Sequence, residues 1–395
     1  MPSPIRSTAN SPFTPGYGKQ PHIFAGHQAE LEELINVFDT YDFGDNHSVL
    51  ISGLRGSGKT SMLGRLQDEA AARQWLVIRD DASRGLMGRV MDTTIPALIN
   101  TLEPQHRRVL SGLKVWHFEA NMTVLPESRP GKPLLRDDLL ALSHGTDFTG
   151  ILITIDEVSS GRARMRELTR FALEVAHALQ SGANIMVVFA GIKVDLNALQ
   201  NQEHVTFLRR SKTLDFHRLS PAETAHALEE TAKIGGRSVS ADALTYMVKA
   251  SQGYPYLVQL VGDYAWRNHP STPQISLEDA QVASAKAVRA AQNRVISKVY
   301  DDLSDKDREF MSAMAVDTGA SKVSDIVQRM GVKDQYVQVY KKRLIDSGYV
   351  RSVGHGRLEF SLPYLGEYIR AQAKDQELAN QPYINDWEHY PPPVM

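Results

Sequence analysis

The chain has no cysteine, no apolar run long enough to cross a bilayer and no strong excess of charge of either sign. Without cysteine, its 395 residues cannot form disulfides, thiolate metal sites or a cysteine nucleophile. Apolar stretches such as Asn184–Ala190 are far shorter than the roughly 20 residues of a membrane helix. Met1–Arg6 lacks the apolar core of a signal peptide. With a formal net charge of −2, binding to nucleic acid would need a local patch. These absences favour a cytoplasmic protein without a membrane partner.

The glycine-rich segment Gly53–Thr60 is the feature around which the chain is organised. It fits the pattern G-x-x-x-x-G-K-[ST], follows the apolar stretch 48–52 and precedes a segment with helical spacing of leucines. Glycines let backbone N–H groups face phosphates, and a helix N-terminus adds partial positive charge. Lys59 would reach the β- and γ-phosphates, and the Thr60 hydroxyl would ligate Mg²⁺. The pattern therefore predicts that ATP or ADP binds at Gly53, Arg55, Gly56, Ser57, Gly58, Lys59, Thr60 and Ser61.

A second motif is the apolar stretch Gly150–Ile155, which ends in the two carboxylates Asp156 and Glu157. Such a continuous run is typical of a parallel strand buried on both faces, and ligands of open α/β sheets lie at the carboxyl ends of strands. By itself, an Asp-Glu pair after a strand is better explained as a helix N-cap. The upstream P-loop favours a Walker B motif instead. Asp156 would then hold Mg²⁺, partly through its waters, and Glu157 would orient and polarise the attacking water.

The rest of the pattern predicts an α/β nucleotide-binding domain followed by two smaller units. Residues 1–20 are rich in Pro, Ser, Gly and Thr, which indicates an extended arm. Residues 21–218 would form the nucleotide-binding domain, with a parallel sheet between helices. Its expected strands are 48–52, 75–79, 150–157, 184–190 and 213–216, and its expected helices include 28–39, 84–105, 133–144, 162–180 and 193–200.

An alternating segment, residues 113–125, would add one or two strands between the second and third core strands. These strands would either cap the sheet or contact a partner, and we favour the cap. The helix over 162–180 opens with a group of arginines, which are Arg162, Arg164, Arg166 and Arg170. Arginines oppose the helix dipole at this end. They indicate a solvated face or, less simply, a partner such as DNA or a neighbouring subunit's nucleotide.

From the capping pair Ser220 and Glu223 onward, the periodicity is helical over 219–302, which predicts a helical lid that ends in a long helix over 277–299. Residues 303–370 read as three helices followed by a hairpin at Gly354–Gly356, the order of a winged helix. Residues 371–395 would form an acidic, proline-ended tail.

The third helix of this winged-helix unit, over 334–347, carries polar and basic side chains suited to the major groove of DNA. Double-stranded DNA would contact Lys341, Lys342, Arg343 and Arg351. Asp334 and Asp346 dilute this charge, and many winged helices bind protein or act as internal brakes. DNA and a protein partner therefore both stay open.

In this order of motifs the chain resembles the AAA+ P-loop ATPases, in the group that holds the origin-recognition initiators, the archaeal-type ATPases and the STAND switch ATPases. It also resembles actinobacterial and prophage ATP-binding proteins with a C-terminal winged helix. The segments that carry the resemblance, besides the Walker motifs, are Phe13–Gly18, Phe24–Gly26, Phe189–Gly191, Thr206–Arg210 and Gly253–Gln259.

The resemblance implies further site residues. Ile23, Phe24 and His27 would line the adenine pocket, and Pro255 would contact the nucleotide from the lid. Arg209 or Arg210 stands where AAA+ proteins keep an arginine finger, which acts in a neighbouring subunit and implies a homo-oligomer.

Two departures from the family pattern point to slow hydrolysis. The usual polar sensor position at the end of the fourth strand reads Ala190-Gly191, so the sensor is absent or is supplied by Lys193 or Asn197. The lid segment Gly253–Pro255 resembles the Gly-x-Pro of the STAND group instead of the arginine of the initiators.

The sequence therefore predicts an ATP-binding and ATP-hydrolysing switch that assembles on DNA or on a partner. One alternative is a STAND-like signalling or defence ATPase in which the winged helix is a brake. Another is a DNA-binding transcriptional regulator with a degenerate site, against which the intact Lys59, Thr60, Asp156 and Glu157 argue. A small-molecule kinase is the least supported, because nothing resembles an acceptor pocket.

Overall fold

The computed structural model describes residues 10–16, 18–101, 134–144 and 150–379. These residues divide into two compact units. The first contains the described residues up to Arg289 together with Asp346–Gly348, and the second contains Ala290–Ile345 and the described residues from Tyr349 onward. The expected strands within 113–125 lie outside the described residues.

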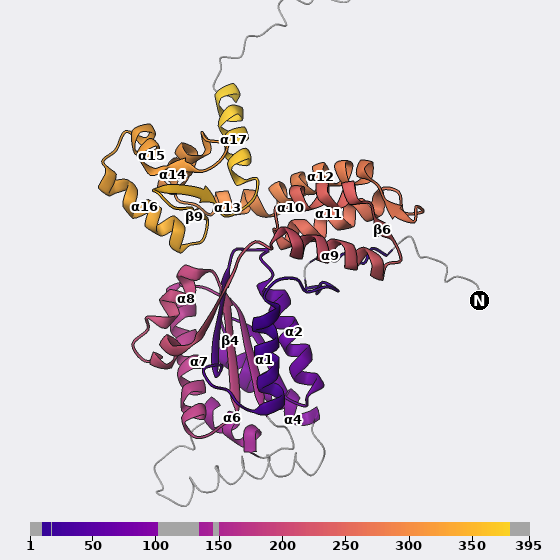
Figure 1. Ribbon diagram of the computed structural model, residues 1–395. Helices are drawn as coiled ribbons and strands as arrows, with labels where there is room; N and C mark the ends of the chain where they lie inside the picture. The colour runs from indigo at the N-terminus through magenta and orange to yellow at the C-terminus, as the bar shows by residue number, and fades with distance from the viewer. Residues whose placement is uncertain (1–9, 17, 102–133, 145–149, 380–395) are drawn as a thin grey trace, which may run out of the picture. The chain divides into compact units, whose positions relative to one another are not determined.

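A five-stranded parallel sheet forms the centre of the first unit (Figure 1). Its strands run in the order β2-β3-β4-β1-β5, and every neighbouring pair is parallel. The sequence predicted all five, which are β1 (Ser48–Gly53), β2 (Leu76–Asp81), β3 (Ile151–Val158), β4 (Ile185–Gly191) and β5 (Lys212–Phe216). β4 and most of β3 are buried, as their unbroken apolar runs require. The predicted α/β class with a parallel sheet between helices is confirmed.

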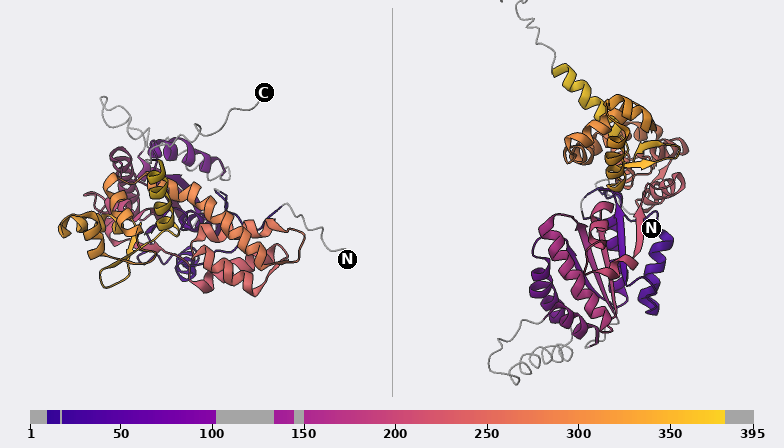
Figure 2. Two further views of the ribbon diagram at one scale, coloured as in Figure 1. Left: turned by 90° about the horizontal axis from the view of Figure 1, so that it is seen from above. Right: turned by 90° about the vertical axis from the view of Figure 1, so that its left-hand side faces the viewer.

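Helices cover both faces of this sheet (Figure 2). On one face, α1 (Gln28–Thr40) and α2 (Lys59–Ala72) bury Leu34 and Leu66 against apolar side chains of β1 and β4. The opposite face is covered by α3 (Leu86–Arg89), α6 (Leu135–His144), α7 (Arg162–Gln180) and α8 (Lys193–Gln200). The helix predicted over 84–105 is built from α3, a π-helical turn over Val90–Thr94 and α4 (Ile95–Thr101), beyond which the described residues stop.

The helices predicted to form a lid follow β5 within the same unit, and we refer to them as the lid. They are α9 (Pro221–Ile234), α10 (Ala241–Ser251), α11 (Pro255–Asn268) and α12 (Leu277–Ala291). The predicted start signal of α9 is confirmed, because the Ser220 side chain accepts from the Glu223 N–H and the Glu223 carboxylate accepts from the Ser220 N–H. The sequence did not predict the short parallel pair β6 (Ser238–Val239) and β7 (Gln274–Ile275). Two-residue strands carry too little alternation to be recognised.

The second unit begins at the end of the long helix predicted over 277–299. The helical conformation runs unbroken through this stretch, because α12 passes through a π-helical turn over Gln292–Ile296 directly into α13 (Ser297–Asp301). There follow α14 (Asp305–Ala315), β8 (Ser321–Lys322), α15 (Val323–Met330), α16 (Asp334–Asp346), β9 (Val350–Ser352), β10 (Arg357–Phe360) and α17 (Leu365–Ala379). The strands form an antiparallel sheet in the order β8-β10-β9. The helix α17 extends into the stretch expected as the tail.

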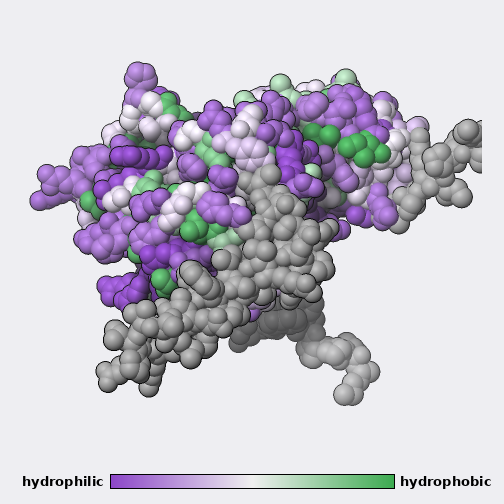
Figure 3. Space-filling model, turned by 90° about the horizontal axis from the view of Figure 1, so that it is seen from below, coloured by the Kyte–Doolittle hydropathy of each residue, from purple (hydrophilic) through white to green (hydrophobic). Residues whose placement is uncertain are grey.

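The described surface offers no membrane-spanning element. Among the residues that the structure describes, no helix combines the length and the apolar character needed to cross a bilayer. On the face drawn in Figure 3, hydrophobic residues appear as small separate patches among hydrophilic ones.

Candidate functional site

The loop between β1 and α2 has the backbone of a phosphate cradle. Gly56 has φ 78° and Gly58 has φ 101°, in the left-handed region that favours glycine. Gly53 is needed for space, since a Cβ there would lie 2.9 Å from Cβ of Phe216. Helix α2 begins at Lys59, directly after the loop, so its first N–H groups and its dipole face the cradle.

The Lys59 side chain folds back across this loop. Its ammonium donates hydrogen bonds to the carbonyl oxygens of Gly53, at 2.8 Å, and Leu54, at 3.0 Å. The pKa of Lys59 is lowered to about 8, mainly by burial; the carboxylate of Asp156 offsets part of this shift, and the charge of Arg55 adds to it. The carboxylate of Asp156 therefore does not fully offset the cost of burying the charged ammonium. An anionic ligand beside Lys59 would be stabilised by that ammonium.

The Ser57 hydroxyl gives an independent indication of a ligand. Ser57 is only 6% exposed, and its Oγ has no hydrogen-bond partner among the described residues. Buried polar atoms are rarely left without a partner unless a ligand, ion or water supplies one. An orphaned hydroxyl inside a glycine cradle fits the phosphate oxygens of a nucleotide.

The two predicted metal-binding residues lie together at the carboxyl end of the sheet. The Thr60 hydroxyl donates to Oδ2 of Asp156 at 2.7 Å, although 96 positions separate the two residues. Among the described residues no group of three or more His, Cys, Asp or Glu could hold a metal by itself. A Mg²⁺ ion would therefore depend on Thr60, Asp156, the phosphates and water, which is its usual environment.

Glu157 occupies an unusual backbone position. Its φ is 54°, its N–H donates to Oδ1 of Asp156 at 2.8 Å, and the pairing of β3 with β4 is irregular between Ile155 and Val158. A left-handed non-glycine residue costs on the order of 1–3 kcal/mol, and such strain is concentrated at functional sites. The irregularity turns the Glu157 side chain outward, and that side chain is exposed.

Sequence reasoning missed a further acidic residue beside Asp156 and Glu157. Asp81, the last residue of β2, lies opposite Asp156 in the register of β2 and β3 and lines the same cavity. Hydrogen bonds from Ser83 are the main reason that the pKa of Asp81 is lowered, with the charge of Arg89 a smaller cause. The signal was available, since β2 also ends in two acids, but only the sheet order makes β2 a neighbour of β3.

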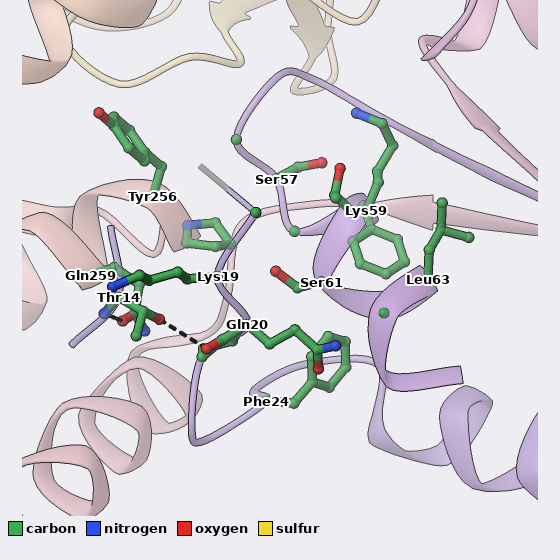
Figure 4. A pocket seen from close by; sticks show the side chains of 18 of the residues that line it. Thr14, Lys19, Gln20, Phe24, Ser57, Lys59, Ser61, Leu63, Tyr256 and Gln259 are labelled. Atoms are coloured by element: carbon green, nitrogen blue, oxygen red, sulfur yellow. Dashed lines mark hydrogen bonds between the residues drawn. The ribbon is translucent and has the colours of Figure 1, made fainter. Parts of the chain in front are cut away.

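A cavity of about 540 Å³ opens around the N-terminal end of α2 (Figure 4). It is lined by most of the predicted nucleotide residues, including Ile23, Phe24, His27 and Pro255. The lining residues Gly56, Ser57, Gly58, Lys59, Thr60 and Ser61 come from the P-loop and the start of α2. Phe216, which sequence reasoning missed, stacks on His27 with ring centroids 4.1 Å apart and lines the cavity as well. Aromatic and apolar walls beside a polar cradle are suited to a nucleoside phosphate.

The N-terminal arm forms another wall of this cavity. Phe13 is 3% exposed and packs on Gly262 of α11 so closely that a Cβ there would overlap the Phe13 ring. The Thr14 N–H donates to the Gln259 side chain at 2.9 Å, and the Thr14 hydroxyl donates to the Gln20 carbonyl at 3.0 Å. The Gln20 amide donates to Asp68 of α2 at 3.0 Å. The arm thus bridges a lid helix and the P-loop helix.

The expected sensor and finger residues lie outside the lining of the cavity. The Lys193 ammonium pairs with Asp215 at 2.8 Å, and Asp215 also accepts from the Ser52 hydroxyl. Asn197 is exposed. Arg209 and Arg210 end a short 3₁₀ helix over Thr206–Arg210, and both are exposed. The structure does not bring either arginine to the cavity of its own chain.

The residues proposed to contact DNA lie in the second unit, and two of them have partners there. The Arg343 guanidinium donates to Asp307 at 2.9 Å and to the Ser304 hydroxyl at 2.7 Å, both at the N-terminus of α14. Arg351 pairs with Glu359 across β9 and β10 at 2.8 Å. Lys341 donates to Gln338 at 3.3 Å, and Lys342 is exposed.

Comparison with models of protein families found one match in each of the two units. Residues 23–191 match the family model described as AAA ATPase domain, and residues 293–369 match a domain of unknown function (DUF8462). A search of curated protein sequences found no match.

Two solved structures share the fold over most of the chain. A Walker-type ATPase of Pyrococcus abyssi is 15% identical with a TM-score of 0.62, and the match covers 89% of this chain and 97% of that one. The Aeropyrum pernix ORC2 protein, solved as ADPNP–ADP complexes, is 17% identical with a TM-score of 0.57, and the match covers 92% and 98%. At such identities the likeness shows the fold alone.

Proposed function

Because residues 23–191 belong to the AAA ATPase domain family, we propose that this chain is a Mg²⁺-dependent ATPase that works as a slow, nucleotide-controlled switch. The observation that carries the proposal is the meeting of Lys59, Thr60 and Asp156 beside the orphaned Ser57 hydroxyl. These groups form a phosphate cradle and a metal site in one cavity. The nucleotides in the Aeropyrum pernix ORC2 structure support ATP and ADP as the ligands.

In this proposal each residue has one task in phosphoryl transfer. The P-loop N–H groups and Lys59 hold the β- and γ-phosphates, and Thr60 and Asp156 hold the metal. Bound Mg²⁺ would neutralise charge on the β- and γ-phosphates. Glu157 is the catalytic residue that orients the attacking water and accepts its proton. His27, Phe216, Ile23 and Phe24 enclose the base, and Pro255 closes the cavity from the lid.

Arg210 or Arg209 would complete the site of a neighbouring subunit. Both are exposed and neither lines the cavity of its own chain, which supports action in trans. A finger of this kind is worth about 10³- to 10⁵-fold in rate. Without it, an isolated chain would hydrolyse slowly. Oligomerisation would therefore control turnover.

The second unit would connect the nucleotide state to a partner. Its helices and antiparallel sheet have the order of a winged helix, with α16 in the position of the recognition helix. For DNA, the first candidate partner, Lys341 and Lys342 are the available contacts. Arg343 and Arg351 already serve intramolecular pairs, and this observation favours the second candidate, a STAND-like switch whose winged helix binds protein as a brake.

ATP turnover as a function of protein concentration tests the proposal. The full chain, Glu157→Gln and Arg210→Ala are compared, each with and without duplex DNA. We expect Glu157→Gln to lose about 10²- to 10⁴-fold in turnover while it still binds ADP. Turnover of the unmodified chain should rise steeply with concentration, and Arg210→Ala should abolish that rise.

The measurements with and without duplex DNA distinguish the two candidate partners. Salt-sensitive stimulation by duplex would favour assembly on DNA. Slow turnover that DNA does not change, with ADP retained through purification, would favour the protein-facing brake. A chain that neither binds nor hydrolyses ATP would refute the ATPase proposal itself.

A further inference from the structure

Two groups at the start of α11 bind the backbone of the P-loop directly. The Tyr254 phenol donates to the carbonyl oxygen of Arg55. The Tyr256 N–H donates to the carbonyl oxygen of Gly56 at 3.3 Å. The lid therefore holds two consecutive carbonyls of the loop that would carry the phosphates.

The Tyr254 side chain is buried and packs closely against Gly56. It is 4% exposed, and a Cβ at Gly56 would lie only 2.6 Å from its hydroxyl oxygen. Glycine at position 56 thus serves the approach of Tyr254 as well as the left-handed turn. Burial raises the pKa of Tyr254, so the phenol stays protonated and remains a donor at every working pH.

The geometry of the peptide bond gives these contacts a consequence for the ligand. In a trans peptide, the C=O and the following N–H point in opposite directions. A lid that holds the Arg55 carbonyl on one side therefore turns the Gly56 N–H to the other side. Inward-facing N–H groups are what a phosphate cradle requires. Lys59 holds the carbonyls of Gly53 and Leu54, and Tyr254 holds the next carbonyl of the loop, that of Arg55.

We propose that Tyr254 is a positioning residue for nucleotide binding: through the Arg55 carbonyl it holds the P-loop in the orientation that binds phosphate. The inference rests on the proposed function, since it assigns a role within the same nucleotide site. Because coupling between two events is reciprocal, bound nucleotide would in turn hold the start of α11 on the loop.

The lid has a second attachment that does not depend on Tyr254. Gln259 and Gly262, one and two turns further along α11, hold the arm through Thr14 and Phe13. Removal of the Tyr254 hydroxyl should therefore leave the lid attached while it frees the Arg55 peptide. The variant Tyr254→Phe keeps the buried ring and deletes only the donor.

The test compares the full chain, Tyr254→Phe and the matched control Tyr246→Phe. Tyr246 lies on α10 of the same lid, is 40% exposed and does not line the cavity. The probe is a fluorescent ADP analogue with Mg²⁺, and the measurements are its Kd and dissociation rate, kcat and KM for ATP, and hydrogen exchange of the loop 54–58. We expect Tyr254→Phe to raise Kd and KM by about five- to tenfold, the usual effect of one buried hydrogen bond. Its kcat should stay within about twofold, and its loop amides should exchange faster. Tyr246→Phe should match the unmodified chain.

The outcomes distinguish failure of the inference from failure of the proposed function. If the unmodified chain binds the probe and Tyr254→Phe binds it equally well, the inference is wrong and the nucleotide site stands. If Tyr254→Phe loses thermal stability and kcat together, with KM and loop exchange unchanged, Tyr254 is a structural residue and the inference is again wrong. If the unmodified chain does not bind the probe, the proposed function fails first.

Discussion

The depressed pKa of Lys59 predicts that nucleotide affinity falls as the pH rises through about 8. Burial lowers this pKa from 10.5 to about 8 in the nucleotide-free protein. Phosphate oxygens beside the ammonium would raise it again. Below pH 8 the lysine is already charged, so binding needs no proton. Above pH 8 binding must first protonate it, and the apparent affinity falls.

The magnitude follows from the protonated fraction. At pH 9, one unit above the pKa, about a tenth of the free protein carries charged Lys59, so Kd should be about tenfold higher than at pH 7. At pH 8 the increase should be about twofold. The stability of the nucleotide-free protein should rise with pH, whereas its affinity for nucleotide falls. Between pH 8 and 10.5 the unfolded chain binds more protons at this lysine, so its contribution to stability rises with pH.

The assay is titration calorimetry of ADP with Mg²⁺ between pH 7 and 9.5, in two buffers with different ionisation enthalpies. Terminal phosphates have their second pKa near 6 and stay ionised over this range. At pH 9 binding should take up about 0.9 proton. The control is Lys59→Arg, whose guanidinium does not titrate below about pH 12, and its pH profile should be flat even where its affinity is lower. A flat profile for the unmodified chain, or the same slope in both proteins, would refute the assignment to Lys59.

Two further predictions concern contacts that the sequence did not reveal. Gly262→Ala should expel the Phe13 ring from α11, because a Cβ at position 262 would overlap that ring. The arm should then become sensitive to limited proteolysis, and the Kd for ADP should rise severalfold. The control is Gly319→Ala, where a Cβ would meet open space, and it should change neither the proteolysis nor the Kd. Equal protease resistance of the two variants would contradict the docked arm. Arg343→Ala should destabilise the second unit by about 1–2 kcal/mol in chemical denaturation, because its guanidinium bonds the N-terminus of α14, and Lys342→Ala should stay within about 0.5 kcal/mol. Equal effects would show that the Arg343 contacts carry no stability.

Local signals were sufficient to predict the elements of the proposed phosphate site. The glycines at 56 and 58 are needed by their own backbone angles, and the apolar run 150–155 specifies a buried parallel strand wherever it is placed. These features depend on neighbouring residues in the chain. The five strands, the start of α2 and the capping box of α9 could therefore be predicted from the sequence.

Contacts between segments that are far apart in the sequence could be identified only in the folded structure. Asp81 becomes a neighbour of Asp156 only because β2 pairs with β3, and Phe216 reaches His27 only because the chain returns to the edge of the sheet beside β1. β6 likewise pairs with β7 only after the chain has passed through α10 and α11.

The sequence by itself determined that this chain has a P-loop, an acidic strand end and a parallel α/β core, because those properties reside in local backbone preference and apolar periodicity. The tertiary structure decided that the arm becomes a wall of the cavity, that Tyr254 holds the P-loop and that Arg343 serves the second unit. Each of these contacts joins residues at least 36 positions apart, and no local preference encodes such a meeting.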